Sequence, residues 1–260
     1  MATLTVAFVT VLGLLIGSFL NVIVWRVPRG ESVISPPSAC PSCHNPVRPR
    51  DNVPVISWLL LRARCRDCDE RIDGRYPAVE AGTAVAFGVV AAHLGMVGHL
   101  PAFLYLTAIA IALALIDIDV HRLPNAIVLP SYVLGGLLLT IPSAIAGNPG
   151  QLLRAAVGLT TLVSFYYALV LIYPAGMGLG DVKLAGVLGL YLGWLGWAEL
   201  VVGAFLGFLV GGLAGAALMV SGKAGRKSKI PFGPHMLVGA FLAIFFAGPI
   251  AGWYLGATNL

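Results

Sequence analysis

Two aspartates, in or beside long apolar segments, are the residues of this sequence best suited to chemistry. Asp181 stands in the glycine-rich sequence GLGDVK (residues 178–183) and is the only acidic residue between Gln151 and Ala198. An ionised carboxylate at the centre of a membrane helix costs about 2.5–3.5 kcal/mol on insertion scales, so such residues usually have a function. The flanking glycines leave room for another backbone to approach the carboxylate. We therefore take Asp181 as a candidate functional residue.

The second aspartate, Asp117, ends another apolar segment and is followed by Pro124 and Asn125. Pro124 suits the first turn of the next helix, because its missing N–H needs no partner there. Two carboxylates at one depth in a low-dielectric site do not both ionise readily, so they would share one proton. Such a pair can act as a general base on water and a general acid on a leaving amine. The pair predicts peptide hydrolysis without a metal or a covalent nucleophile.

Other roles for these carboxylates stay open at this point. Asp119 could be a solvated loop residue, and Asp181 could pair with Lys183 or cap a helix N-terminus. Acidic residues inside membranes also mark proton relays, so a proton-coupled transporter using Asp117 and Asp181 is the main alternative. Transporters commonly contain internal repeats, and none is visible here. A structural assembly factor with inactive aspartates is a third alternative, which no feature of the sequence favours.

All four cysteines lie in one polar, arginine-rich segment, residues 26–76, as two CxxC pairs: Cys40 with Cys43, and Cys65 with Cys68. Two such pairs about 20 residues apart match the spacing of zinc sites. Four thiolates leave Zn²⁺ no open position, so we expect a structural site rather than a catalytic one. A redox pair and unligated thiols are the alternatives. The distribution of basic residues, described below, places this segment in the cytosol, where disulfides are rare. We interpret His44, beside Cys43, as a bystander.

The composition indicates an all-α polytopic membrane protein. Of 260 residues, 58% are hydrophobic and only 10% are charged, against roughly a quarter charged in soluble proteins. Apolar runs predict about eight transmembrane helices, each near the roughly 20 residues that cross the hydrocarbon. The first run lacks the basic n-region of a signal peptide, so we expect it to be retained. The expected spans are about 2–25, 78–98, 101–118, 125–142, 152–173, 182–198, 200–220 and 231–255. The expected domains are a first transmembrane helix (1–25), a zinc-binding loop domain (26–76) and a membrane core (77–260).

The basic residues predict the orientation of these spans. With the N-terminus outside, 15 of the 16 lysines and arginines fall on the cytoplasmic side, and Arg154 alone falls on the other. Four of the 15 follow the seventh span, namely Lys223, Arg226, Lys227 and Lys229. Orientation thereby accounts for the net charge of +5, and we expect a lipid bilayer rather than nucleic acid as the partner. Both Asp117 and Asp181 then lie at the cytoplasmic face.

Glycines four residues apart predict two close helix contacts. Gly13 and Gly17 form one such pair, and a longer series consists of Gly203, Gly207, Gly211 and Gly215. Small residues at this spacing let helix backbones approach within a membrane.

The ordered motifs resemble those of the type IV prepilin peptidases, the aspartic membrane proteases of pilus and type II secretion systems. Residues 178–183 are similar to the family's GxGDxK motif, and residues 117–125 to its Asp-x6-Pro-Asn segment. Further similar stretches are residues 17–22, 26–32, 51–58, 75–80 and 230–235, together with the two CxxC pairs. The resemblance extends from about residue 13 to about residue 239.

The resemblance implies an enzyme of the bacterial inner membrane that cuts the leader from prepilins or pseudopilins, after glycine, at the cytoplasmic face. It implies Asp117 and Asp181 as catalytic residues, with Asp119 as the second choice in place of Asp117. Members of this longer type also methylate the new N-terminus with S-adenosylmethionine. Candidate residues near that cofactor are Glu80, Arg75 and Asn21, although Glu80 could pair with Arg75 and Asn21 could bond another helix. The resemblance fixes neither the particular pilin nor the oligomeric state.

Overall fold

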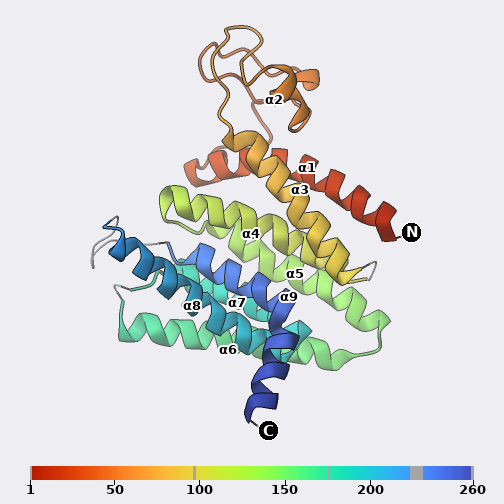
Figure 1. Cartoon of the computed structure of the whole chain (residues 1–260), viewed down its shortest axis with the longest axis vertical. Helices are drawn as coiled ribbons and strands as arrows, with labels where there is room; N and C mark the ends of the chain where they lie inside the picture. The colour runs from red at the N-terminus through yellow and green to blue at the C-terminus, as the bar shows by residue number, and fades with distance from the viewer. Residues whose placement is uncertain (1, 96–97, 175, 223–230, 259–260) are drawn as a thin grey trace. The chain divides into compact units, whose positions relative to one another are not determined.

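The computed structural model describes residues 2–95, 98–174, 176–222 and 231–258. Its long helices are α1 (Ala2–Arg26), α3 (Arg75–Leu94), α4 (Leu100–Val120), α5 (Asn125–Ile145), α6 (Pro149–Ile172), α7 (Leu179–Leu195), α8 (Trp197–Val220) and α9 (Gly233–Thr258) (Figure 1). The loop between α1 and α3 holds the short helix α2 (Ile56–Leu60) and two 3₁₀ turns, η1 (Val27–Arg29) and η2 (Pro49–Asp51). The extended pairings within the described ranges are two isolated β-bridges. The predicted all-α class is confirmed.

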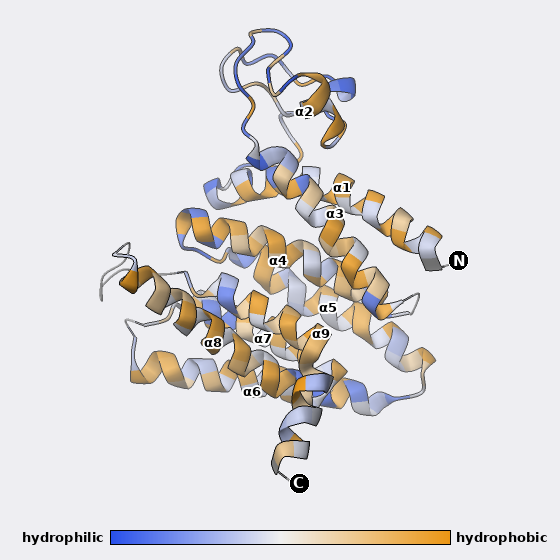
Figure 2. Ribbon diagram, in the orientation of Figure 1, coloured by the Kyte–Doolittle hydropathy of each residue, from blue (hydrophilic) through white to orange (hydrophobic). Residues whose placement is uncertain are grey.

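Seven of the long helices are long and apolar enough to cross a membrane, by length and composition, and hydrophobic residues dominate them in Figure 2. Each of the eight predicted spans corresponds to one long helix. The exception to the membrane-spanning length is α7, whose 17 residues extend about 26 Å, against about 30 Å of hydrocarbon. It also begins at Leu179, three residues before the predicted span, so Asp181 lies inside its first turn.

The chain forms two compact units, residues 1–112 and 113–260. In the first unit α1 packs closely on α3. A Cβ added to Gly13 would lie 2.7 Å from the Cα of Ala84, and one added to Gly17 would lie 2.7 Å from the Cα of Glu80. No larger residue fits at this separation, so the predicted packing role of the two glycines is confirmed.

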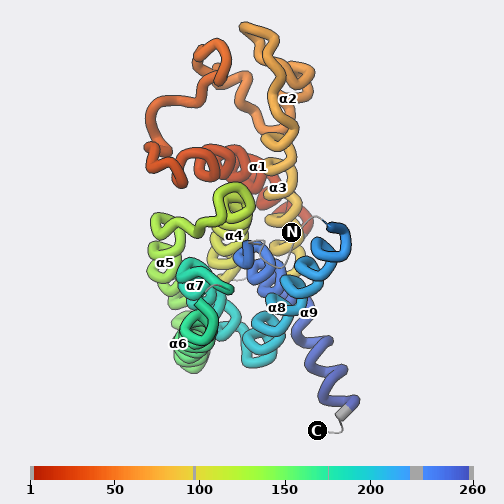
Figure 3. Tube along the Cα trace, turned by 90° about the vertical axis from the view of Figure 1, so that its left-hand side faces the viewer, coloured from red at the N-terminus to blue at the C-terminus, as the bar shows by residue number. Residues whose placement is uncertain are grey.

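In the second unit α7 is the central helix, in contact with α5, α6, α8 and α9. Thirteen of its 17 residues are buried, which fits a helix that is apolar on all sides. Figure 3 shows α6 and α7 side by side. At their contact the backbones meet at glycines, because a Cβ on Gly193 would lie 2.7 Å from the carbonyl oxygen of Arg154.

Three glycines of the predicted series in α8, namely Gly203, Gly207 and Gly211, face α9. A Cβ on Gly207 would lie 3.4 Å from the Cα of Met236, and one on Gly211 would lie 2.9 Å from the ring of Phe232. Gly203 likewise lies beside Ala240 and Ala243 of α9. The glycines of α8 therefore set the distance at which α9, and the residues at its beginning, are held.

The guanidinium of Arg154, from α6, caps the C-terminus of α7. Nε of Arg154 donates to the carbonyl of Gly193 at 2.8 Å, and Nη2 donates to those of Trp194 and Leu195 at 2.7 and 3.0 Å. The last carbonyls of a helix lack partners within it, and a cation also interacts well with this end of the helix dipole. The single basic residue predicted on the outer side therefore has a structural partner.

Candidate active site and metal centre

Asp181 is the third residue of α7, and the start of that helix fixes its carboxylate. The N–H of Gly178, at the N-cap, donates to its Oδ2 at 3.0 Å, and the N–H of Asp181 donates to the carbonyl of Gly178 at 3.1 Å. The side chain thus satisfies one of the amides that a helix N-terminus leaves without partners. Asp181 is 9% exposed, and within the described residues its Oδ1 accepts no hydrogen bond. One oxygen of the carboxylate is held and the other stays available.

Asp117 lies in the last turn of α4 and is held in a comparable way. Its Oδ2 accepts a hydrogen bond from the N–H of Gly233 at 3.1 Å, and its side chain is buried. Gly233 is the first residue of α9, so the beginning of that helix supplies the donor. Each aspartate therefore receives one glycine backbone N–H at the start of a helix.

Gly233 is a residue that sequence reasoning missed. Residues 230–235 are among the family-like stretches of the sequence, but that resemblance assigns no role to Gly233; α9 begins within them, and Ile230 lies outside the described residues. A signal was present, since Gly233 stands between Phe232 and Pro234 and has no side chain to separate its amide from a neighbour. A Cβ at this position would lie 2.7 Å from Oδ2 of Asp117.

The first turns of α7 and α9 meet the loop after α4 at Leu123. A Cβ on Gly180 would lie 3.2 Å from the Cβ of Leu123, and one on Gly233 would lie 3.3 Å from its Cδ2. Asp117 is bonded to Gly233 and Asp181 directly follows Gly180, so Leu123 lies beside the immediate surroundings of both aspartates. The structure thus brings together the two aspartates that the sequence paired.

Lys183 joins α7 to the segment that follows Asp117. Its ammonium donates to Oδ1 of Asn125 at 3.0 Å, and the hydroxyl of Tyr132 donates to its backbone carbonyl at 2.6 Å. Asn125 begins α5, with Pro124 as the preceding N-cap residue rather than in the first turn. Asp119, two residues beyond Asp117 on the same helix, is exposed, whereas Asp117 is buried.

The four cysteines form a cluster in the loop of the first unit. Their Sγ atoms all lie within 4.8 Å of one another. Four sulfurs at about 2.3 Å from one zinc ion stand about 3.8 Å apart, and the Sγ atoms of Cys40 and Cys68 are 3.7 Å apart. The donor set and its spacing therefore fit a tetrahedral metal ion. His44 is not a member of this cluster.

The two CxxC pairs have the same backbone structure. In each, the N–H of the first cysteine donates to the carbonyl five residues later, at 3.0 Å for Cys40 and 2.8 Å for Cys65. The residue four positions after that cysteine donates back to its carbonyl and has a positive φ, 59° at His44 and 57° at Asp69. His44 thus has a place in a turn rather than a ligand role, and each turn aims two thiols at a common centre.

The electrostatics of the cluster favour a bound cation. Backbone N–H groups of Cys43 and Ser42 lower the pKa of the Cys40 thiol to about 7. The N–H of Glu70 also lowers the pKa of Cys68, but desolvation and the three neighbouring thiols outweigh it and raise that pKa to about 12. Negative charges on the four sulfurs repel one another, and a divalent cation between them would offset this repulsion.

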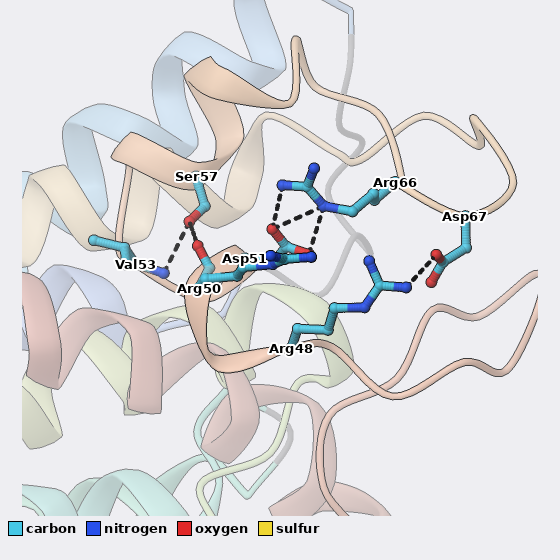
Figure 4. A network of polar contacts seen from close by, with 7 residues as sticks. All are labelled: Arg48, Arg50, Asp51, Val53, Ser57, Arg66 and Asp67. Carbon is cyan, nitrogen blue, oxygen red and sulfur yellow. Dashed lines mark hydrogen bonds and ion pairs between the residues drawn. The ribbon is translucent and has the colours of Figure 1, made fainter.

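Two ion pairs fasten the second CxxC turn to η2 (Figure 4). Arg66 forms a forked pair with Asp51, with contacts of 2.6 and 2.9 Å, and Arg48 lies 2.7 Å from Asp67. The hydrogen bond and charge of Arg66 hold the pKa of the Asp51 carboxyl below its usual range. The residues between the cysteines thus position the loop.

The candidate cofactor residues are engaged in contacts within the first unit. Nδ2 of Asn21 donates to the carbonyl of Tyr76 at 3.1 Å, and Oε2 of the buried Glu80 accepts the N–H of Val55 at 2.7 Å. The N–H of Arg75 donates to Oδ1 of Asp73 at 2.8 Å. These contacts organise the loop around the ends of α1 and α3, and cofactor binding by these residues stays a prediction.

Taken together, the fold and the site define a polytopic membrane protein with a pair of buried aspartates and a four-cysteine loop. A family model described as "Bacterial Peptidase A24 N-terminal domain" matches residues 11–94, and one described as "Type IV leader peptidase family" matches residues 104–220. The chain belongs to the type IV leader peptidase family.

Relatives in three bacteria support this membership, and each is named prepilin leader peptidase/N-methyltransferase. The protein of Aeromonas hydrophila is 35% identical over 96% of this chain and 93% of its own length. That of Pseudomonas aeruginosa is 34% identical over 94% and 91%, and that of Neisseria gonorrhoeae is 35% identical over 91% and 89%. No solved structure matches the chain.

Proposed function

We propose that this protein is a membrane aspartic endopeptidase that removes the leader of type IV prepilins or pseudopilins after glycine. The observation that carries the proposal is the pair of buried aspartates, each with one carboxylate oxygen held by a glycine N–H and the other available. The relatives' names supply the substrate class. We further propose that the protein lies in the bacterial inner membrane with its N-terminus outside, so that cleavage takes place at the cytoplasmic face.

In the proposed mechanism Asp117 and Asp181 share one proton. The ionised carboxylate takes a proton from a water molecule, whose oxygen attacks the carbonyl carbon of the scissile peptide bond. The protonated carboxyl then gives its proton to the departing amide nitrogen, and the C–N bond breaks. The products are the leader, ending in a carboxylate, and the pilin, with a new amino terminus. The N–H groups of Gly178 and Gly233 keep both carboxylates oriented for these transfers.

The four cysteines would hold a structural zinc ion, which supplies rigidity to the loop rather than catalysis, because all four positions around the metal are taken. We propose that the protein also methylates the new N-terminus, as the relatives' names state for them. S-adenosylmethionine would supply the methyl group. Asn21 and Glu80 are occupied by contacts within the chain, so no step is assigned to them here.

The experiment is a cleavage assay of the purified full-length protein in detergent with a prepilin, read by mass spectrometry. Asp117→Asn and Asp181→Asn are expected to abolish leader removal, while Asp119→Asn, at an exposed position, should retain most of it. Methylation of a pre-cleaved substrate should survive all three changes. Leader removal by either Asp117→Asn or Asp181→Asn would refute the assignment, and loss only in Asp119→Asn would transfer the role to that residue.

A further inference from the structure

Helix α2 exposes large apolar side chains although it belongs to a polar loop. Ile56, Leu59 and Leu60 are 54%, 60% and 77% exposed, and Figure 2 shows the helix in hydrophobic colours. Another part of the helix is fixed, because the buried hydroxyl of Ser57 accepts the N–H of Val53 and donates to the carbonyl of Arg50 (Figure 4). Three aliphatic side chains are thus held outward on a firmly attached helix, which marks an interaction surface.

A contact within the first unit places α2 beside the beginning of α3, a candidate membrane span. The N–H of Val55, directly before α2, donates to Oε2 of Glu80. Glu80 lies five residues into α3, about 7.5 Å along its axis, and a helical side chain points back toward the N-terminus. The helix α2 therefore starts level with the first turns of a helix that crosses the membrane.

Aromatic residues mark the same level as a membrane–water boundary. Trp25 near the end of α1 and Tyr76 at the start of α3 are 58% and 49% exposed, and Asn21 of α1 bonds the carbonyl of Tyr76. Tryptophan and tyrosine concentrate where membrane and water meet. Because Glu80 lies farther into α3 than Tyr76, α2 adjoins this boundary.

The charge of the loop also fits a membrane surface. Residues 26–75 contain nine arginines against six carboxylates, and two of the arginines, Arg62 and Arg64, directly follow α2 and are exposed. Anionic headgroups attract such basic segments. A helix with an apolar side and flanking basic residues is typical of elements that lie in the interface plane.

We propose that α2 is an interfacial anchor. Its side chains Ile56, Leu59 and Leu60 insert between the headgroups and acyl chains of the membrane that α1 and α3 cross, and its flanking arginines contact anionic headgroups. The anchor holds the four-cysteine module against the membrane surface, so the module has a fixed orientation instead of turning freely on its two connections.

The test uses the full-length protein in nanodiscs of phosphatidylethanolamine and phosphatidylglycerol. The photoreactive residue p-benzoylphenylalanine replaces Leu60 in one variant and, as a control, Asn45 of the first CxxC turn in another, since both positions are exposed. After irradiation, mass spectrometry of the peptides counts lipid adducts. Zinc content equal to that of the unmodified protein shows that the loop is folded in both variants.

The proposal expects lipid adducts at position 60 several-fold above those at position 45, rising with the phosphatidylglycerol fraction. Equal yields at the two positions would overturn it. A crosslink from position 60 to a second copy of the chain, or to added prepilin in place of lipid, would also overturn it and would assign the surface to that partner.

Discussion

Replacing Gly233 by alanine is the most direct perturbation of the aspartate pair that leaves both carboxylates in the chain. The new Cβ would lie 2.7 Å from Oδ2 of Asp117, well inside van der Waals contact, so the carboxylate must rotate or α9 must retreat. Either shift breaks the hydrogen bond from the Gly233 N–H. Hydrogen bonds to charged groups contribute about 1.5–3 kcal/mol. Because about 1.4 kcal/mol corresponds to a factor of ten in rate, we expect kcat/KM for leader removal to fall roughly 10- to 100-fold.

The assay measures initial rates of prepilin cleavage for the wild type, Gly233→Ala and a matched control, Gly248→Ala. Gly248 lies on the same helix, is exposed, and has nothing within 4 Å of the position of an added Cβ. The control should therefore cleave at the wild-type rate, and the thermal unfolding midpoint of each variant separates a local effect from loss of the fold. Wild-type cleavage by a folded Gly233→Ala protein would refute the view that this amide positions Asp117.

Three further perturbations test other parts of the structure. Arg154→Ala removes three contacts to the final carbonyls of α7 and should lower stability by about 2–3 kcal/mol, seen as a lower unfolding midpoint in detergent; an unchanged midpoint would contradict the capping role. Cys68→Ser should abolish zinc binding, measured as the metal content of the purified protein by mass spectrometry. His44→Asn should keep the zinc, because asparagine tolerates the positive φ at this position. Loss of zinc from both variants would show that His44 is more than a turn residue. Arg66→Ala should speed zinc release to a chelator. Arg66 lowers the pKa of Asp51, so the ion pair stabilises the folded loop fully above the unfolded carboxyl pKa of about 3.9. This stabilisation is lost only as the pH falls through the lower folded pKa. The difference in zinc release rate between Arg66→Ala and the wild type should therefore stay constant between pH 6 and 8.

The helices were predictable because their apolar runs are long, and the membrane admits few other structures for such runs. Their ends were less so. The start of α7 was placed three residues late because Asp181 was treated as a boundary residue, whereas its carboxylate satisfies an N-terminal amide and extends the helix past it. The short length of α7 has a physical reason, since a helix enclosed by four others need not match the hydrocarbon thickness.

The contacts that complete the site could not be predicted from pattern. The bond from Gly233 to Asp117 joins residues 116 positions apart and uses a backbone amide, which leaves no mark in residue type. The capping of α7 by Arg154 was equally hidden, because charge counting treats an arginine as a signal of orientation and not as a hydrogen-bond donor. By contrast, the cysteine cluster was predictable, since thiols have few roles and the CxxC spacing restricts them further.

Arg154 also bears on the order in which the chain assembles in the membrane. α6 precedes α7 in the sequence, so the three carbonyls that receive the guanidinium do not yet exist when α6 is synthesised. In the proposed orientation this arginine must cross to the outer side of the membrane, although basic residues usually stay on the cytoplasmic side. It then has no carbonyl partner from α7 until that helix is made. Only when the second helix inserts beside the first does the charge find its partners, so α6 and α7 should enter the membrane as a helical hairpin, closed by the arginine at its outer end.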